Sequence, residues 1–400
     1  MHTFALSSSI LLSALAAFGT PVARQAQPSG TSSFQPSVPL ASILSAPTPA
    51  LALGQAMSQV TNPDPLPSPS GSYPLTTSDT PLALPNDLLQ TFMGKTLPYA
   101  AASYCNSVNN GSWTCGPYCQ ANPNFQITAV GGDGGTLQRW FVGYNPPTNE
   151  IILSRQGAGA NQLATVLYVT SFLPATLHPD IARTLSRVSG PRTASSPPVG
   201  VLGSILDPVL LANNNGDEVQ YAVVNDGMQT SWNSTWPGVK AAVQAQLNAH
   251  PNAARVFVVG HSFGTAVALF DALALRSIVP DSIPVQISGT GQPRAGNPVF
   301  ANLVDTLVQQ TSGSTSGSFT YHHIINHDDL FPHLPPLVSG YEHSINEVWI
   351  TQSNSTPTTP TYLCTTRENV NCGNSQGLGL NMLDHPGPYW GIFAGANCTA

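Results

Sequence analysis

Charged side chains are scarce in this 400-residue chain. Asp, Glu, Lys and Arg make up 8% of the residues, whereas an ordinary globular protein has about a quarter. The 12 Lys and Arg are outnumbered by 19 Asp and Glu, and they form no basic run. Because phosphate backbones are held by clustered basic side chains, we expect no nucleic-acid partner. Solubility must come from Ser, Thr, Asn and Gln, which suits an exported protein.

Long apolar segments are also missing beyond the first twenty residues. The run from Phe4 to Phe18 is too short to span a bilayer comfortably, but it suits the core of a signal peptide. Its amino-terminal side is atypical, because it offers only His2 and the amino group. We therefore predict a signal peptide over residues 1–19, secretion of the protein, and no stable membrane anchor.

A charge-poor stretch follows. Pro, Ser and Thr dominate residues 20–84, where Arg24, Asp64 and Asp79 are the only charges. Such a composition cannot bury enough apolar area to offset its ordering entropy. The stretch is predicted to be a pro-region or a linker, and the composition leaves both alternatives open. The folded domain is expected over residues 85–400.

Cysteine occurs in an even number, as an exported protein needs if every thiol is to be paired. Three cysteines lie near the start of the expected domain and three near its end: Cys105, Cys115, Cys119, Cys364, Cys372 and Cys398. No second Cys/His pair at ligand spacing accompanies Cys115 and Cys119. Disulfides are therefore expected rather than a metal site, and their pairing stays open at this point.

From about residue 216 onward, predicted strands and helices alternate. In chain order these are a strand at 219–224, a helix that opens with Pro237 at its first position, an apolar strand and a helix around residue 262, a strand at 284–288, a helix at 299–310 and a strand at 321–325. A hairpin over 138–154 precedes them. The alternation predicts βαβ units and an α/β fold with a largely parallel sheet.

The most informative motif joins that apolar strand to its helix. Residues 256–259 are Val, Phe, Val and Val, and the turn that follows reads Gly260-His261-Ser262-Phe263-Gly264. A Gly-x-Ser-x-Gly turn from strand to helix is a nucleophile elbow, whose tightness excludes bulk two positions from the serine. The bare pattern also fits an ordinary glycine-rich turn, but its context favours a catalytic serine.

A serine nucleophile needs a base to take its proton and an acid to orient the base. In α/β-hydrolases, whose serine lies at a nucleophile elbow, the three residues follow along the chain in the order Ser, Asp or Glu, His. The loop after the strand at 321–325 contains Asp328 and Asp329, and either could be the acid. Four histidines come late enough to be the base: His327, His333, His343 and His385. His385 is favoured, because proline, glycine and aromatic residues hold its loop.

Together these motifs resemble those of the fungal class 3 lipases, secreted triacylglycerol lipases whose family also contains feruloyl esterases. The matching segments are 260–264, 291–297, 326–332, 334–336 and 384–389. The resemblance implies an α/β-hydrolase fold, with a mostly parallel central sheet, flanking helices and a helical lid. It implies Ser262 as nucleophile and His385 as base. Asp329, which stands before an apolar pair and a proline, is implied as the acid instead of Asp328.

The resemblance also locates the oxyanion hole, which needs two backbone N–H groups aimed at the developing charge. One is the amide of Phe263, directly after the nucleophile. The other is the amide of Ala158, where the family usually has Ser or Thr. Ala158 offers only its N–H, and Asn161 is an alternative donor.

A lid is expected directly after that loop, over the apolar residues 163–173. Its site-covering members are Leu163, Val166, Leu167 and Phe172. They could cover the site in water and contact lipid when open; the alternative is a buried core helix. An apolar lid favours long acyl chains. Residues 174–216, longer than in typical members, are either an added cap over the acyl groove or a disordered insert.

Other assignments also follow from the resemblance. It implies the disulfides Cys105–Cys398, Cys115–Cys119 and Cys364–Cys372, and it treats 291–297 as a structural turn and 225–228 as a packing element. Independently, the sequons at Asn110, Asn233 and Asn354 permit glycosylation of a secreted chain.

The sequence thus predicts a secreted serine ester hydrolase, a triacylglycerol lipase that works through an acyl-enzyme without metal or cofactor. We expect a monomer that meets its acylglycerol substrate at a lipid–water interface. Alternatives are a mono- or diacylglycerol lipase, a feruloyl or short-chain carboxylesterase, and a non-catalytic lipid-binding relative.

Overall fold

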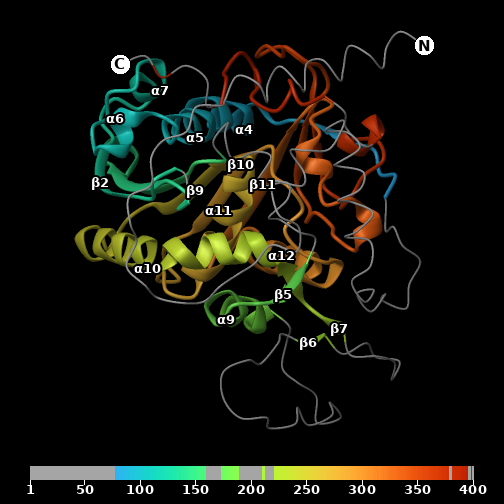
Figure 1. Ribbon diagram of the computed structural model, residues 1–400, viewed down its shortest axis with the longest axis horizontal. Helices are drawn as coiled ribbons and strands as arrows, with labels where there is room; N and C mark the ends of the chain where they lie inside the picture. Colours follow the sequence, from blue (N-terminus) through green and yellow to red (C-terminus); the bar gives the residue numbers. More distant parts are fainter. Residues whose placement is uncertain are drawn as a thin grey trace, which may run out of the picture.

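The computed structural model describes residues 77–134, 136–158, 173–188, 210–211, 220–314, 316–377, 381–394 and 398. The predicted signal peptide and most of the predicted pro-region lie outside the described residues. So do Asn161 and the predicted lid residues Leu163, Val166, Leu167 and Phe172. The described chain folds around one large sheet with helices on both faces (Figure 1).

Nine strands of the described chain form this sheet, in the order β1-β13-β12-β11-β10-β9-β4-β3-β2. The five at its centre are parallel: β4 (Glu150–Arg155), β9 (Arg255–His261), β10 (Val285–Thr290), β11 (Phe319–Asn326) and β12 (Glu347–Ile350). The edges are antiparallel: β3 (Trp140–Asn145) and β2 (Gln126–Gly131) on one side, β13 (Thr361–Cys364) and β1 (Leu82–Ala83) on the other. The predicted α/β fold with a parallel centre is confirmed, and the expected hairpin is β3–β4.

The remaining elements flank this sheet. The helices are α4 (Asn86–Thr91), α5 (Leu97–Ala102), α6 (Asn106–Asn109), α7 (Pro117–Gln120), α9 (Pro179–Val188), α10 (Asp226–Ala249), α11 (Phe263–Arg276) and α12 (Pro298–Thr311). A π-helical segment, η1 (Phe92–Thr96), joins α4 to α5; short 3-10 turns are η2 (Pro146–Thr148), η3 (Phe331–His333), η4 (Leu337–Ser339) and η5 (Gly373–Gln376). Two small ribbons pair β5 (Pro174–Thr176) with β8 (Val223–Asn225), and β6 (Leu210–Leu211) with β7 (Gln220–Tyr221).

Both faces of the central strands are buried, which explains the uninterrupted apolar run Val256–Val259 in β9. In β9, Val256 and Val258 join the core beneath α10, α11 and α12, which Figure 1 shows in front of the sheet. Phe257 and Val259 point to the opposite face, where they pack with residues of α5 and its neighbours. The strand that leads to Ser262 is therefore fixed from both sides.

The helix expected to open at Pro237 begins eleven residues earlier, so that prediction is wrong. α10 starts at Asp226, and the side chain of Asn225 caps it by accepting a hydrogen bond from the Met228 N–H at 3.0 Å. Its buried side is continuous across the proline: Met228, Trp232, Trp236, Val239, Val243 and Leu247. The apolar stripe on both sides of Pro237 outweighs the single helical hydrogen bond that proline removes.

The described part of the 174–216 segment is folded against the helical layer. α9 buries Ile181 and Leu185, and the Thr184 hydroxyl donates to the Leu273 carbonyl of α11 at 2.6 Å. Leu273 is eleven residues after Ser262, roughly 16 Å along α11 at 1.5 Å per residue. α9 is therefore held away from the elbow and is not a cap over the serine. Residues 189–209 and 212–219 lie outside the described residues.

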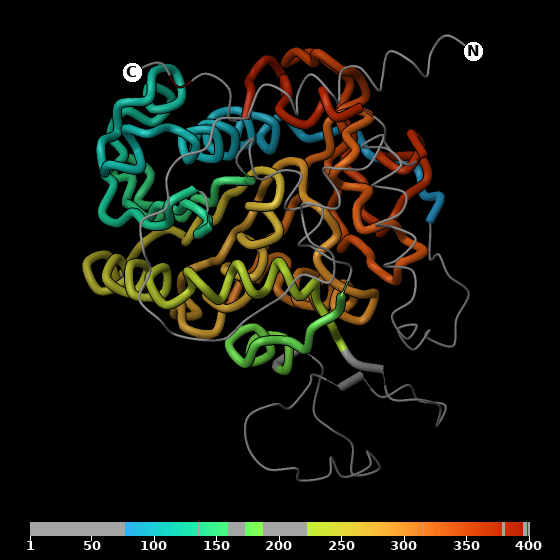
Figure 2. The backbone as a smooth tube through the Cα atoms, in the orientation of Figure 1, coloured from blue at the N-terminus to red at the C-terminus, as the bar shows by residue number. Residues whose placement is uncertain are grey.

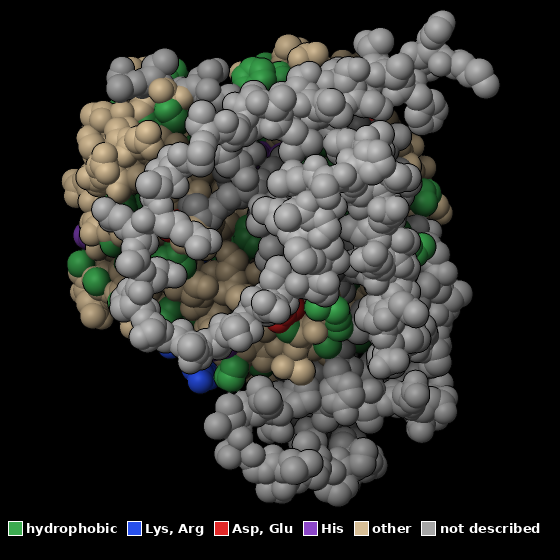
Figure 3. Space-filling view, viewed as in Figure 1, with side chains coloured by type: hydrophobic (Ala, Val, Ile, Leu, Met, Phe, Trp, Pro, Cys, Tyr) green, Lys and Arg blue, Asp and Glu red, His purple; other side chains and the backbone are tan. Residues whose placement is uncertain are grey.

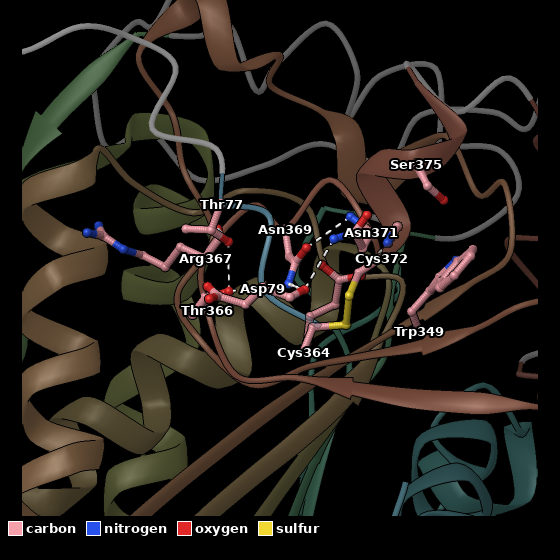
Figure 4. The surroundings of a disulfide bond; sticks show 12 residues. Thr77, Asp79, Trp349, Cys364, Thr366, Arg367, Asn369, Asn371, Cys372 and Ser375 are labelled. Carbon is pink, nitrogen blue, oxygen red and sulfur yellow. Dashed lines mark hydrogen bonds between the residues drawn. A yellow bond between two sulfur atoms is a disulfide. The ribbon is translucent and has the colours of Figure 1, made fainter. Parts of the chain in front are cut away.

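The fold begins before the boundary expected at residue 85. β1 pairs with β13, and upstream of it the Thr77 hydroxyl meets that of Thr366 at 2.7 Å. The Asn369 amide donates to the Asp79 carbonyl at 2.9 Å, beside the Cys364–Cys372 disulfide (Figure 4). The segment 77–84 belongs to the folded domain. It has few apolar residues to bury, but the edge of the sheet provides hydrogen-bond partners that hold it in place.

Many of the charged side chains that the structure describes are buried inside the fold. Blue and red side chains occupy little of the described surface on the face in Figure 3. Two ion pairs are almost completely buried: Arg155 with Asp271 at 2.6 Å, and Arg294 with Glu368 at 2.8 Å. Such pairs fix the relative positions of their elements, because separating either one would leave a buried charge unpaired.

Three disulfides connect the chain in the pairing that the resemblance implies: Cys105–Cys398, Cys115–Cys119 and Cys364–Cys372. The first joins residues 293 apart in sequence, whereas the second joins residues 4 apart. Figure 2 shows the blue helices α4 and α5 beside the red carboxyl-terminal segment, where Phe92 and Leu97 share a core with Tyr389 and Trp390. The long disulfide therefore reinforces an interface that is already packed.

We expect replacement of both Cys105 and Cys398 by Ser to lower the free energy of unfolding by about 2–5 kcal/mol, because the long loop constrains the unfolded chain most. The matched control replaces Cys115 and Cys119 by Ser, which releases a short loop and should cost less. Urea unfolding of both double variants measures the difference, and equal losses would contradict the loop-length argument.

Candidate active site

Ser262 lies at a sharp turn between β9 and α11. Its backbone has φ 60° and ψ −139°, a conformation that costs an L-residue energy and recurs at functional sites. The turn is possible because its neighbours are glycines. A β-carbon on Gly260 would lie 2.6 Å from the Gly264 carbonyl oxygen, and one on Gly264 would lie 2.5 Å from that of Gln156. These approaches explain the Gly-x-Ser-x-Gly spacing.

The structure brings Ser262, His385 and Asp329 into one hydrogen-bonded line. The His385 Nε2 lies 2.7 Å from the Ser262 Oγ, and its Nδ1 lies 2.8 Å from Asp329 Oδ2. All three side chains are buried, with Asp329 fully so. The Phe331 N–H donates to the other Asp329 oxygen at 3.0 Å, which keeps the carboxylate oriented. This arrangement can draw a proton from Ser262 to His385 while Asp329 holds the tautomer.

The carboxylate that meets His385 belongs to Asp329, not to its neighbour Asp328. Asp328 is only half-buried, and its backbone N–H donates to Asp384 Oδ2 at 3.3 Å. The other late histidines stand elsewhere: His327 contacts Asp384, and the His343 Nε2 contacts the Pro332 carbonyl at 2.8 Å. Burial also lowers the pKa of His333 and His343 to about 4, so both stay neutral.

The loop 291–297 takes part in the site, which sequence reasoning missed. A β-carbon on Gly291, whose φ is +62°, would lie 2.7 Å from the His385 Cε1 and 3.2 Å from Asp329 Oδ2. The loop is anchored by Arg294, whose guanidinium meets both Glu368 oxygens at 2.8 Å. That guanidinium holds the pKa of Glu368 well below its usual range despite burial. The turn is structural as expected, but it also forms the wall behind the base.

The second expected oxyanion donor lies on residues 156–158, which we call the oxyanion loop. A β-carbon on Gly157 would lie 2.7 Å from the Ser262 β-carbon, so this loop runs directly beside the nucleophile. Arg155, just before it, is held by the buried Asp271 of α11 through two hydrogen bonds, at 2.6 and 2.9 Å. The loop and the elbow helix are thereby locked together. Ala158 follows at the edge of the site and is half-buried.

Aromatic and histidine side chains complete the surroundings of the base. The Phe331 ring packs on the His385 imidazole, with 4.0 Å between ring centroids. His261, the second residue of the elbow motif, lies with its ring centroid 4.8 Å from that of His385, and it contacts Tyr104. Only the position of His261 beside Ser262 could have drawn attention to it in the sequence. Tyr104 and Phe331 carry no motif signal.

In the described part of the chain, one group of side chains has its possible metal-ligand atoms within 4.8 Å of one another: Glu347, Cys364 and Cys372. The two cysteines are joined in a disulfide, so neither offers a thiolate ligand. This grouping therefore cannot hold a metal while the disulfide is intact.

Residues 207–339 match the family model described as Lipase (class 3). A secreted mono- and diacylglycerol lipase 1 from Fusarium solani is 35% identical over 168 residues, which cover 40% of this chain and 45% of that protein. A secreted mono- and diacylglycerol lipase 3 from Gibberella zeae is 27% identical and covers 68% of this chain and 73% of that protein. The aligned region thus spans less than half of the Fusarium protein.

Solved structures show the same fold. A triacylglyceride lipase from Rhizomucor miehei superposes with a TM-score of 0.59 and 24% identity, covering 80% of this chain and 100% of that one. At this identity the likeness concerns the arrangement of sheet and helices.

We expect Asp329→Asn to reduce ester hydrolysis at least 100-fold, because an amide cannot hold the His385 tautomer or stabilise its cation. Asp328→Asn is the matched control, one residue away on the same loop, and should change turnover less than about threefold. Steady-state kinetics with a soluble p-nitrophenyl ester compares them. A larger effect at Asp328 would reverse the assignment.

Gly291→Ala should lower kcat more than it changes KM, since the added methyl group pushes His385 away from Ser262. A loss of about tenfold or more is expected. Gly313→Ala is a control for the loss of a positive-φ glycine, because a β-carbon there meets nothing within 4 Å. If both variants keep wild-type kcat, the proposed contact with the base does not matter for turnover.

Proposed function

We propose that this chain is a member of the class 3 lipase family, a secreted serine ester hydrolase that cleaves acylglycerols. The observation that carries the proposal is the hydrogen-bonded line from Ser262 through His385 to Asp329, set at a strained elbow. Each member comes from a loop or turn at the carboxyl end of a sheet strand or from the carboxyl-terminal segment. The three groups belong to one chain, so the site needs no second copy, and we propose that the protein acts as a monomer.

The reaction follows from that geometry. The Ser262 Oγ attacks the ester carbonyl carbon while His385 Nε2 takes its proton, and the carbonyl oxygen becomes an oxyanion. The amides of Phe263 and Ala158 bind this oxyanion. As the tetrahedral intermediate collapses, His385 gives the proton to the leaving alcohol oxygen. Water then attacks the acyl-Ser262 ester while His385 takes its proton; His385 returns that proton to the Ser262 Oγ as the acyl–oxygen bond breaks, and the fatty acid leaves. No metal or cofactor takes part in these steps.

The substrate class rests on the family and on the apolar segment after Ala158. We propose triacylglycerols as substrates, with Leu163, Val166, Leu167 and Phe172 as lid residues that meet the lipid surface. Two relatives carry the name mono- and diacylglycerol lipase, so partial glycerides are the alternative that a substrate panel must include.

Export is supported by several features. Relatives are named as secreted proteins, and three disulfides need an oxidising compartment. Within the described ranges, no helix is both long and apolar enough to cross a bilayer. Asn110, Asn233 and Asn354 are exposed and could accept glycans. We propose residues 1–19 as a signal peptide and the segment between it and Thr77 as a pro-region or linker.

Ser262→Ala should abolish hydrolysis of tributyrin and labelling by a fluorophosphonate, while the thermal unfolding midpoint stays within a few degrees of the wild type. The hydroxyl is the only group removed, and no packing is lost. Activity that persists in this variant would remove Ser262 from the mechanism. Absence of labelling in the wild type would favour the non-catalytic lipid-binding alternative.

The substrate class is tested by comparing tri-, di- and monoacylglycerols of matched chain length with methyl ferulate, below and above the solubility limit of each. A triacylglycerol lipase should be fastest on the triacylglycerol and faster above the limit. Preference for mono- and diacylglycerols would shift the proposal to partial glycerides, and preference for methyl ferulate would contradict it.

A further inference from the structure

The site contains a second hydrogen-bonded line, which the reaction steps above do not use. It links the oxyanion loop to the base through two side chains. The Gly157 N–H donates to the Tyr104 hydroxyl oxygen at 3.0 Å, and that hydroxyl lies 2.6 Å from the His261 Nδ1. The His261 Nε2 in turn lies 3.0 Å from the His385 backbone carbonyl. Four segments far apart in sequence meet along this line.

The direction of each hydrogen bond in the line is fixed by chemistry. Burial raises the pKa of Tyr104, so its phenol keeps its proton. Burial first, and the neighbouring His385 second, lower the pKa of His261 to about 3, so its ring is neutral. The His385 carbonyl can only accept, so the single proton of the neutral His261 ring is on Nε2 and points to that carbonyl. Nδ1 is then an acceptor, and the Tyr104 hydroxyl donates its proton to it.

Neutrality of His261 matters for the reaction. During catalysis His385 becomes an imidazolium, and a charged ring 4.8 Å away would oppose that charge. Tyr104 and His261 therefore position their neighbours without adding charge to the site. The His385 carbonyl receives a second donor, the Tyr389 hydroxyl, at 2.8 Å. The backbone of the base is thus held from two sides.

We propose that Tyr104 and His261 act as a positioning couple that holds the oxyanion loop at a fixed place relative to the catalytic base. Gly157 precedes Ala158, the expected donor that lacks the usual hydroxyl, and glycine is the residue with the greatest backbone freedom. The Tyr104 hydroxyl removes that freedom by binding the Gly157 N–H. The Tyr104 hydroxyl thus fixes the oxyanion loop by a contact from another segment. The methyl side chain of Ala158 cannot form a hydrogen bond that would do so from within the loop.

The inference rests on the proposed ester hydrolysis and is tested by Tyr104→Phe, which removes one oxygen and keeps the ring. The matched control is Tyr99→Phe on α5: Tyr99 is fully buried, and its hydroxyl accepts from the Asn145 amide at 2.8 Å, outside the active site. Enzyme concentration is set by fluorophosphonate titration, so that kcat refers to competent sites only.

With p-nitrophenyl butyrate, Tyr104→Phe should lower kcat about 10- to 100-fold and change KM less than about twofold, because misplacing the oxyanion donor weakens the transition state more than the ground state. Affinity for an alkyl boronic acid, whose adduct with Ser262 mimics the tetrahedral intermediate, should fall by the same factor as kcat/KM. The pH at which kcat/KM is half-maximal should not move. Tyr99→Phe should leave kcat per titrated site unchanged.

A double-mutant cycle tests whether the two residues act together. In a His261→Leu background, Tyr104→Phe should cost less than about twofold, since its partner is already gone. If the two substitutions lower kcat additively, the proposal that Tyr104 and His261 act together is wrong. Wild-type kcat and boronate affinity in Tyr104→Phe would also overturn the proposal, even if the stability of that variant fell, because that pattern describes a structural role only.

Failure of the inference can be told apart from failure of the proposed function. If the wild type neither hydrolyses esters nor labels with the fluorophosphonate, the function itself is wrong. If the wild type is active and labelled while Tyr104→Phe matches it per titrated site, only the positioning couple is wrong.

Discussion

The active site depends on the close approach of backbones around Ser262. Five glycines permit it: Gly157, Gly260, Gly264, Gly289 and Gly291. A β-carbon on any of them would lie less than 3 Å from another atom, and for Gly157 and Gly291 those atoms include Ser262 and His385 themselves. The surrounding segments have no side chains at these points, so they can approach closely enough to hold the strained backbone of Ser262 in place. The elbow, the oxyanion loop and the 291–297 loop behind His385 therefore depend on one another for their positions.

Few charged side chains lie around the active site. Two buried ion pairs, Arg155–Asp271 and Arg294–Glu368, anchor the two loops that flank the serine and the base. Between these anchors, the contacts are hydrogen bonds among neutral groups, apart from Asp329. The Asp329 carboxylate, 2.8 Å from His385 Nδ1, is the charge that directly contacts the imidazolium formed in the proposed reaction.

The sequence was informative where chemistry must sit in a fixed order. The central sheet follows from alternation, and Ser262, the loop with Asp328 and Asp329, and His385 could be named because the carboxyl ends of parallel strands meet at one edge. The choice of Asp329 over Asp328 came from the resemblance to the class 3 lipases. The sequence was misleading at Pro237, where a continuous buried stripe overrides a local helix breaker. It failed at residues 77–84, whose partners lie on β13 and on the segment that follows it. Tyr104 and Gly291 could not be found, because their roles arise from approaches between segments more than 50 residues apart.

The Cys105–Cys398 disulfide has a consequence for the order of assembly. Its second cysteine follows the first by 293 residues, which at typical translation rates takes roughly 15–60 s to synthesise. During that interval Cys105 must wait as a thiol or in a temporary bond with a nearby cysteine. His385 also emerges late, 123 residues after Ser262. During synthesis the chain therefore contains Ser262 before it contains His385, and the site is complete only when the segment that carries His385 has folded onto the rest.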